Sequence, residues 1–150
     1  MDKEVVKNEV KAFMKEQPLG VIATIAENGT PEVATVNYFL DDDWTLYILT
    51  DQNSRKIQNL RKNQHIAFVS GTIPQPHTVQ IQGTAELIEA SNTEYGALQQ
   101  KMSDSKRLDN DPMYNMFGNN YLILKIKIEW LRWLYFDEAS GDPKYVELVP

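Results

Sequence analysis

The sequence predicts an α+β domain built on a six-stranded antiparallel β-barrel, closed or nearly closed, with flanking helices. Three observations predict it. Runs of alternating apolar and polar residues, the pattern of half-buried strands, follow one another through turn-forming residues along most of the chain. Helical spacing recurs only at the start, in the middle and in one insertion between strands. No repeat, low-complexity tract or linker divides the 150 residues, so we expect a single domain over 1–150.

The first third of the chain predicts a helix followed by a hairpin. Asp2 can cap the helix, whose apolar residues recur at helical spacing and which ends before Pro18. Two extended runs, 19–26 and 32–40, flank an Asn-Gly pair at 28–29, a strong short-range signal for a hairpin turn. We expect these two runs to be antiparallel neighbours.

The middle of the chain predicts three more strands around a short helix. An acidic turn leads to a strand over 44–50, which extends the hairpin into a meander, and a helix over 54–62 separates that strand from one over 65–70. After a proline-rich loop comes the clearest strand, 78–88, in which apolar residues alternate with Thr, Gln and Glu. One face of this strand is expected in the core and the other in a polar environment.

The last third predicts an insertion and a long final strand. Ser91 and Glu94 match a capping box at the start of a helix, and a second short helix is expected to begin at Asp111. The final strand covers 121–136 and alternates clearly at first. The alternation is lost over 130–133, which predicts a bulge or a bend there.

Composition and missing motifs exclude several classes of function. Without cysteine the chain can form no disulfide, thiolate zinc site, thiol nucleophile or iron–sulfur cluster, and with only His65 and His77 no metal site is predicted. A net charge of −6 argues against nucleic acid and membranes as partners. No signal peptide or membrane-spanning run is present, so we expect a cytoplasmic protein. Phosphate-loop, Rossmann, HExxH and GxSxG motifs are absent, which argues against nucleotide hydrolysis, Rossmann cofactor binding and triad chemistry.

One local conflict in the sequence points to chemistry. Arg55 and Lys56 lie in the first turn of the helix over 54–62, where the positive end of the helix dipole favours acidic residues. Free backbone N–H groups, the hydroxyls of Thr50 and Ser54 and two cations together make a site suited to a phosphate group.

The cations, histidines and aromatic residues of interest can also have a purely structural role. Arg55 and Lys56 can equally be solvated helix residues paired with Asp51 or Glu32. The two histidines are expected at the surface or in hydrogen bonds rather than on a haem. Large aromatic residues at the end of the last strand, such as Trp133, are more often plain core than cover for a ligand.

Three segments carry a resemblance to a known family. PEVATVNYFL (31–40), LYILTDQNSRKIQNLRKNQHIAFV (46–69) and TVQIQGTAELIEA (78–90) resemble the pyridoxamine 5′-phosphate oxidase-like flavin-binding split barrels, in the right order and over most of the chain. The resemblance implies a split β-barrel, FMN as cofactor at the subunit interface of a homodimer, and an oxidoreductase acting on a small molecule.

The resemblance also implies which residues contact FMN. Its most specific part, T-x-x-x-S-R-K after a strand, binds the FMN phosphate in the family, and the strand from 34 to 39 lies along the flavin ring. The start of the strand over 78–88 reaches the flavin as well, although Gln80 there can also belong to a solvated strand face. The implied cofactor-binding residues are Ala34, Thr35, Val36, Asn37, Leu49, Thr50, Ser54, Arg55, Lys56, Thr78 and Gln80.

The sequence also departs from the family's name-giving enzymes. Those enzymes carry Arg and Lys where this chain has Ala34 and Phe39, and they end in an Arg-x-His-Asp-Arg-like segment that this chain lacks. The chain more closely resembles the general-stress-protein-like branch. Three functions follow as expectations: an FMN-dependent oxidoreductase with an unknown substrate, a non-catalytic flavin-binding or stress-response module, or a deazaflavin- or haem-binding relative.

Overall fold

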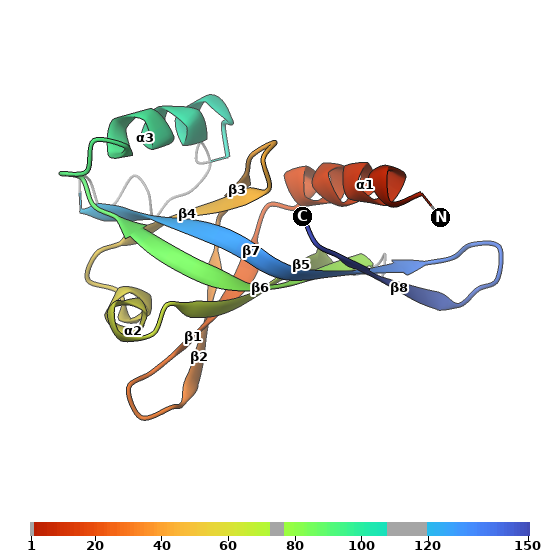
Figure 1. The fold of residues 1–150 in the computed structure, drawn as a ribbon, viewed down its shortest axis with the longest axis horizontal. Coiled ribbons are helices and arrows are strands. Elements are labelled where there is room, and N and C mark those ends of the chain that lie inside the picture. Colours follow the sequence, from red (N-terminus) through yellow and green to blue (C-terminus); the bar gives the residue numbers. More distant parts are fainter. Residues whose placement is uncertain (1, 73–76, 108–119) are drawn as a thin grey trace.

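The computed structural model describes residues 2–72, 77–107 and 120–150. Its helices lie on two sides of one curled antiparallel sheet, with α1 and α3 on one side and α2 on the other (Figure 1). The elements are α1 (Lys3–Glu16), β1 (Gly20–Ile25), β2 (Pro31–Val36), β3 (Phe39–Leu40), β4 (Thr45–Asp51), α2 (Arg55–Lys62), β5 (His65–Thr72), β6 (His77–Ile88), α3 (Tyr95–Asp104), β7 (Tyr121–Phe136) and β8 (Pro143–Leu148).

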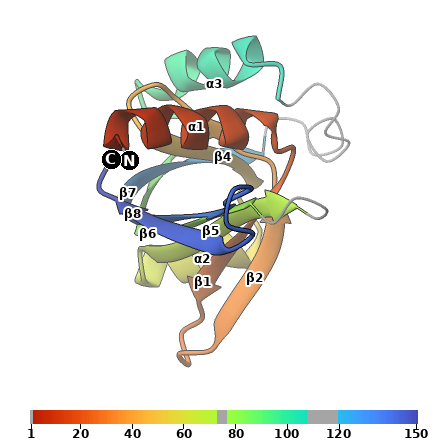
Figure 2. The same ribbon diagram turned by 90° about the vertical axis from the view of Figure 1, so that its right-hand side faces the viewer.

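The sheet is a barrel that is split between its two edges. The strand order is β2-β1-β5-β6-β7-β4-β3, with β8 added beside β7, and every pair is antiparallel. The two ends of this order, β2 and β3, are joined in the chain by Asn37 and Tyr38 alone. The sheet therefore has to curl round until its edges approach each other, as Figure 2 shows. This confirms the predicted fold class.

Strand division differs from the sequence expectation at two places. The run over 32–40 forms two strands, because β2 pairs with β1 while β3 pairs with β4, so the expected meander does not form. The hairpin partner of β7, β8, was not predicted. Its residues are exposed except for Val146 and Leu148, so they leave only a weak periodic pattern. For this reason the described sheet has eight strands instead of six.

Two helix expectations have separate outcomes. The capping box at Ser91 is wrong, because the N–H of Glu94 is bound by the side chain of Asn92 at 2.8 Å and Glu94 itself is the N-cap of α3. The expected proline-rich loop around Pro74 and the expected helix from Asp111 lie outside the described residues. Among the helices that the structure does describe, none is long and apolar enough to cross a membrane.

A β-bulge in β7 confirms the predicted irregularity in the final strand. Trp130 pairs with Gln82 and Ile128 with Gly83, so Glu129 is an extra residue. A side chain at Gly83 would overlap the carbonyl oxygen of Lys127, so the close strand approach requires glycine. The β7 residues in the main core change at this point from even to odd numbers: Leu122, Leu124, Ile126 and Ile128 come before it, and Leu131 and Trp133 after it.

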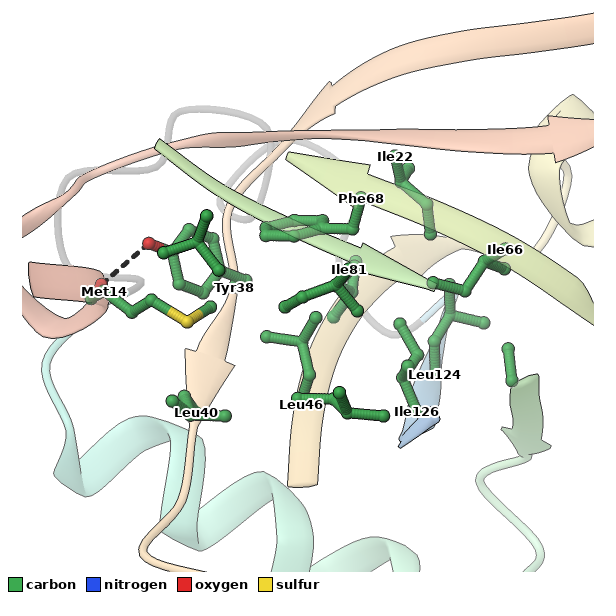
Figure 3. Packing of buried hydrophobic residues seen from close by; sticks show 14 of the residues in the cluster. Met14, Ile22, Tyr38, Leu40, Leu46, Ile66, Phe68, Ile81, Leu124 and Ile126 are labelled. Atoms are coloured by element: carbon green, nitrogen blue, oxygen red, sulfur yellow. Dashed lines mark hydrogen bonds between the residues drawn. The ribbon is translucent and has the colours of Figure 1, made fainter. Parts of the chain in front are cut away.

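Two groups of buried residues hold the fold together. The main core fills the barrel and joins it to α1 and α2. Figure 3 shows part of this core, including Met14 of α1 and Ile126 of β7. Within it the Tyr38 hydroxyl donates to the carbonyl oxygen of Met14 at 2.7 Å and lies 3.0 Å from Ser70 Oγ, which ties the link between the sheet edges to α1 and β5. A smaller group, including Tyr47 and Ile123, lies under α3.

Candidate functional site

The turn from β4 into α2 brings the expected phosphate-binding hydroxyls together. Thr50 is buried, and the backbone N–H of Ser54 donates to the carbonyl oxygen of Asp51 at 3.0 Å, which closes the turn. The hydroxyl oxygens of Thr50 and Ser54 lie 3.5 Å apart. Ser54 is the N-cap of α2, but its side chain makes no capping hydrogen bond, and the first helical turn contains no acidic residue. The positive end of this helix is therefore not compensated by a cap or by a carboxylate of its own first turn.

Lys56 is the cation best suited to an anionic ligand. Its side chain is half-buried and forms no ion pair with any residue that the structure describes. Burial lowers the pKa of Lys56 below its usual value, and the charge of Asp51 only partly opposes this shift. A bound anion would restore the stability of the charged ammonium.

Arg55 is placed differently. Its guanidinium pairs with the carboxylate of Glu32 on β2, and its side chain is 78% exposed. The structural alternative, a solvated cation paired with Glu32, thus describes Arg55, whereas the expected partner Asp51 forms no ion pair with either cation in the described residues.

Two grooves flank strand β2 and contain several of the expected residues. A groove of about 350 Å³ at the start of α2 is lined by Glu32, Ala34, Arg55 and Lys56, together with Thr24 and Val33. A groove of about 370 Å³ is lined by Thr35 and Thr78, with the apolar residues Pro18, Leu19, Gly20, Val21, Val69 and Gly71 and the hydroxyl of Ser70. Because Ala34 and Thr35 are neighbours on one strand, their side chains point to opposite faces, and β2 connects the two grooves.

The free edge of β2 supplies backbone hydrogen-bonding groups between these grooves. The Ala26 N–H donates to the Thr30 carbonyl oxygen at 2.9 Å, so these two residues form a hydrogen-bonded pair of the β1–β2 ladder. Every second pair of an antiparallel ladder is hydrogen-bonded, and Ala34 therefore exchanges backbone hydrogen bonds with β1. The peptide groups of Val33 and Thr35 consequently point away from β1. Within the described residues β2 has no other strand partner, and these donors and acceptors are open to a ligand.

Asn37 contributes a fixed acceptor next to the end of β2. Its Nδ2 donates to the carbonyl oxygen of Arg107 at 2.6 Å. Since a carbonyl can only accept, this contact determines the amide orientation. Asn37 Oδ1 is buried and has no hydrogen-bond partner among the residues that the structure describes.

Six expected residues line neither groove: Asn37, Thr50 and Ser54, described above, and Val36, Leu49 and Gln80. Leu49 packs with the residues under α3, and Val36 is buried in the main core. Gln80 is exposed on the outer sheet face, between its register partners Val69 and Arg132. The side chains of Leu49 and Val36 are therefore not available to a ligand, and the ladder alternation directs the backbone groups of Val36 to β1.

The aromatic alternative resolves toward core packing, and of the two histidines His65 is exposed as expected whereas His77 is half-buried among aromatic rings. Trp133 is buried in the main core, and His77 lies against Trp133 and Phe13 with ring centroids 5.4 and 6.1 Å away.

Sequence reasoning missed the support beneath Arg55. Asn59 Nδ2 donates both to Thr24 Oγ1 at 3.0 Å and to Glu32 Oε1 at 2.8 Å. The available signal was that Thr24 and Asn59 are polar residues at buried positions of a strand and a helix, where hydrogen-bond partners are required.

Comparisons with known proteins bear on the family of the chain. The family model described as pyridoxamine 5′-phosphate oxidase matches residues 6–134. A curated relative, the pyridoxine/pyridoxamine 5′-phosphate oxidase of Crocosphaera subtropica, is 31% identical over 83 residues, which are 55% of this chain and 39% of that protein. The chain therefore matches well under two thirds of the length of this relative.

Two solved structures are similar in fold. General stress protein 26 from Bacillus anthracis aligns with a TM-score of 0.66 and 24% identity over 95% of this chain and 98% of that chain. A pyridoxamine 5′-phosphate oxidase-related, FMN-binding protein from Nostoc punctiforme aligns with a TM-score of 0.60 and 14% identity over 97% and 93%. At these identities the likeness establishes the shared split-barrel fold.

Proposed function

Because the chain belongs to the pyridoxamine 5′-phosphate oxidase family, we propose that it binds FMN along β2 and acts as an FMN-dependent oxidoreductase on a small molecule. The observation that carries the proposal is Lys56, a half-buried cation without an ion pair in the described residues. It lies in the first turn of α2, a helix whose N-cap Ser54 makes no capping hydrogen bond and has its hydroxyl 3.5 Å from that of Thr50. FMN supplies the redox chemistry when bound, as carrier of hydride or electrons. The residues of the chain bind and orient it.

The phosphate end of the proposed site is the groove at the start of α2. The dianionic phosphate would accept hydrogen bonds from the ammonium of Lys56, the guanidinium of Arg55 and the hydroxyls of Thr50 and Ser54. Free N–H groups of the first helical turn add further donors. A chain with a net charge of −6 needs such local cations to hold an anion.

The ring end of the proposed site is the groove with Thr35 and Thr78. Its walls are largely apolar, which suits an aromatic ring system and keeps water away from it. The backbone groups of Val33 and Thr35 at the free edge of β2 match the donors and acceptors on the polar rim of a flavin. Asn37 Oδ1 is a further acceptor for a ring N–H group.

We also propose a homodimer that covers this site. The outer face of β1, β2 and β5 exposes apolar side chains: Val33 is 72% and Leu19 51% exposed, and Val21 and Val69 are half-buried beside them. Val21 is the register partner of both Thr35 and Val69, so the ring groove belongs to this face. A second copy placed here would bury the apolar patch, protect the edge strand β2 and close the groove.

The substrate is proposed to be a small molecule other than pyridoxamine phosphate. Phe39 stacks on Tyr47 with ring centroids 6.1 Å apart, and Ala34 packs against the main core. Neither position can offer the positive charge that would hold a phosphorylated substrate.

Two measurements test the proposal in sequence. Titration of the chain with FMN, followed by flavin fluorescence, should give saturable binding that is weakened in Lys56→Ala. Addition of NADH or NADPH to the complex without oxygen should then remove the visible absorption of oxidised flavin. Binding without reduction by either donor would instead favour the non-catalytic flavin-binding module, and selective binding of a deazaflavin would favour the deazaflavin relative.

A further inference from the structure

We infer that Glu32 is a positioning residue that holds the guanidinium of Arg55 in place for the phosphate of the ligand. This inference rests on the proposed function and assigns the specificity for phosphate to a residue outside the T-x-x-x-S-R-K segment. It depends on a difference within the Glu32–Arg55 ion pair: the side chain of Glu32 is anchored and that of Arg55 is not.

The Glu32 side of the pair is anchored to the buried part of the fold. Glu32 Oε1 accepts from Asn59 Nδ2 at 2.8 Å, and the same Nδ2 donates to Thr24 Oγ1 at 3.0 Å. Thr24 is 1% and Asn59 8% exposed, so these partners have little freedom to move. Because β2 also holds its backbone, the carboxylate of Glu32 has a fixed position at the rim of the phosphate groove.

The Arg55 side has no such anchor. Its side chain is 78% exposed, and its ion pair with Glu32 is its one polar side-chain contact in the part of the chain that the structure describes. The pair uses one terminal nitrogen of the guanidinium and leaves the other N–H donors for a further acceptor. Glu32, Arg55 and Lys56 line the same groove, so a phosphate placed beside Lys56 lies within the reach of those donors.

The pair therefore serves binding more than folding. An ion pair as exposed as this one adds little to the stability of the folded chain. A long arginine side chain, however, loses its rotamer freedom when it binds a ligand, and a partner that already restricts it reduces that loss. A carboxylate at a phosphate groove would by itself repel the ligand. If Glu32 only adds negative charge, its removal should therefore strengthen phosphate binding. If Glu32 positions Arg55, its removal should weaken phosphate binding.

The experiment compares FMN with riboflavin, which has the same ring and sugar chain but no phosphate, using the full chain. Glu32→Ala should weaken FMN binding about three- to tenfold and leave riboflavin binding unchanged. Glu32→Gln, which keeps an oxygen acceptor, should recover part of the loss. In a chain that already carries Arg55→Ala, Glu32→Ala should cause no further loss of FMN affinity. Glu27→Ala is the matched control, since Glu27 pairs with Lys62 at 2.7 Å on the neighbouring hairpin and helix.

The outcomes separate this inference from the proposed function. Unchanged or tighter FMN binding in Glu32→Ala overturns the inference, and so does an equal loss for riboflavin, which would mean a general structural role. If the unaltered chain binds FMN and Lys56→Ala weakens it, the proposed function stands even when the inference fails. If the unaltered chain binds no FMN, both are overturned.

Discussion

The hydroxyl oxygens of Thr50 and Ser54 lie 3.5 Å apart across the turn from β4 into α2. This closeness is set by the sheet, because Thr50 pairs with Leu122 of β7 and the turn that follows is closed by the backbone of Asp51. The two hydroxyls and the helix N-terminus are thus held in place before any ligand arrives. Such preorganisation favours tight binding of an anion.

The first prediction concerns Lys56. Lys56→Ala should weaken FMN binding at least about tenfold, since a charge-assisted hydrogen bond contributes about 1.5–3 kcal/mol and about 1.4 kcal/mol corresponds to a factor of ten. Lys62→Ala on the same helix is the control, because its ammonium pairs with Glu27 at 2.7 Å. Equal losses in both variants, measured by flavin titration, would show that the effect is not specific to Lys56.

The second prediction concerns the stability of the ligand-free chain. The folded state lowers the pKa of Lys56 from its usual 10.5, mainly by burial, so between the lowered pKa and 10.5 the unfolded chain binds more protons at this position than the folded chain. The contribution of Lys56 to stability therefore rises with pH through that window and is lost as pH falls through the lowered pKa.

It follows that Lys56→Met should unfold at higher urea concentration than the unaltered chain at neutral pH, and that this advantage should shrink as the pH approaches 10.5. Urea unfolding at several pH values provides the measurement. A Met variant that is less stable at neutral pH would contradict the account of Lys56 as a cation kept for its ligand.

The third prediction concerns the proposed dimer. Val33→Lys places a charge on the apolar outer face next to the free edge of β2 and should convert a dimer into a monomer that binds FMN more weakly. Val5→Lys on α1, another exposed valine at 49%, should leave both properties unchanged. Sedimentation analysis gives the mass; a dimer that persists in Val33→Lys would place the subunit contact elsewhere.

The fourth prediction concerns the bulge in β7. Insertion of one alanine after Trp130, in addition to the extra residue Glu129, would shift the rest of the strand by one residue and turn Leu131 and Trp133 away from the main core. The expected loss is more than about 4 kcal/mol of unfolding free energy, since each large core side chain contributes about 2–5 kcal/mol. Glu129→Ala keeps the extra residue and should change stability by no more than about 0.5 kcal/mol. Similar stability of the insertion and the substitution would contradict a fixed register of β7 beyond the bulge.

Local patterns were sufficient for much of the fold. The Asn-Gly hairpin, the strand over 78–88 and the lost alternation near Trp130 each depend on neighbouring residues, and the structure confirms all three. The division of the run over 32–40 was not predictable in this way, because alternation continues through it. Its two halves separate only because their partners, β1 and β4, lie at opposite ends of the sheet order.

The candidate site shows the same limit. Cations at a helix N-terminus, Arg55 and Lys56, are visible in the sequence, yet their different surroundings are not. Glu32 makes the two cations differ, because it pairs with Arg55 and not with Lys56. The contacts that place Glu32 there join residues that are 23 or more positions apart in the chain. Contacts of that kind depend on the tertiary structure rather than on local periodicity.

The most direct test of the central claim is to purify the chain, record its visible spectrum, release any chromophore by denaturation and identify it by mass, and titrate the protein with FMN if it is colourless. The account predicts a yellow protein that releases FMN, or a colourless one that binds added FMN and loses affinity when Lys56 is replaced by Ala. A colourless protein that does not bind added FMN would contradict the account.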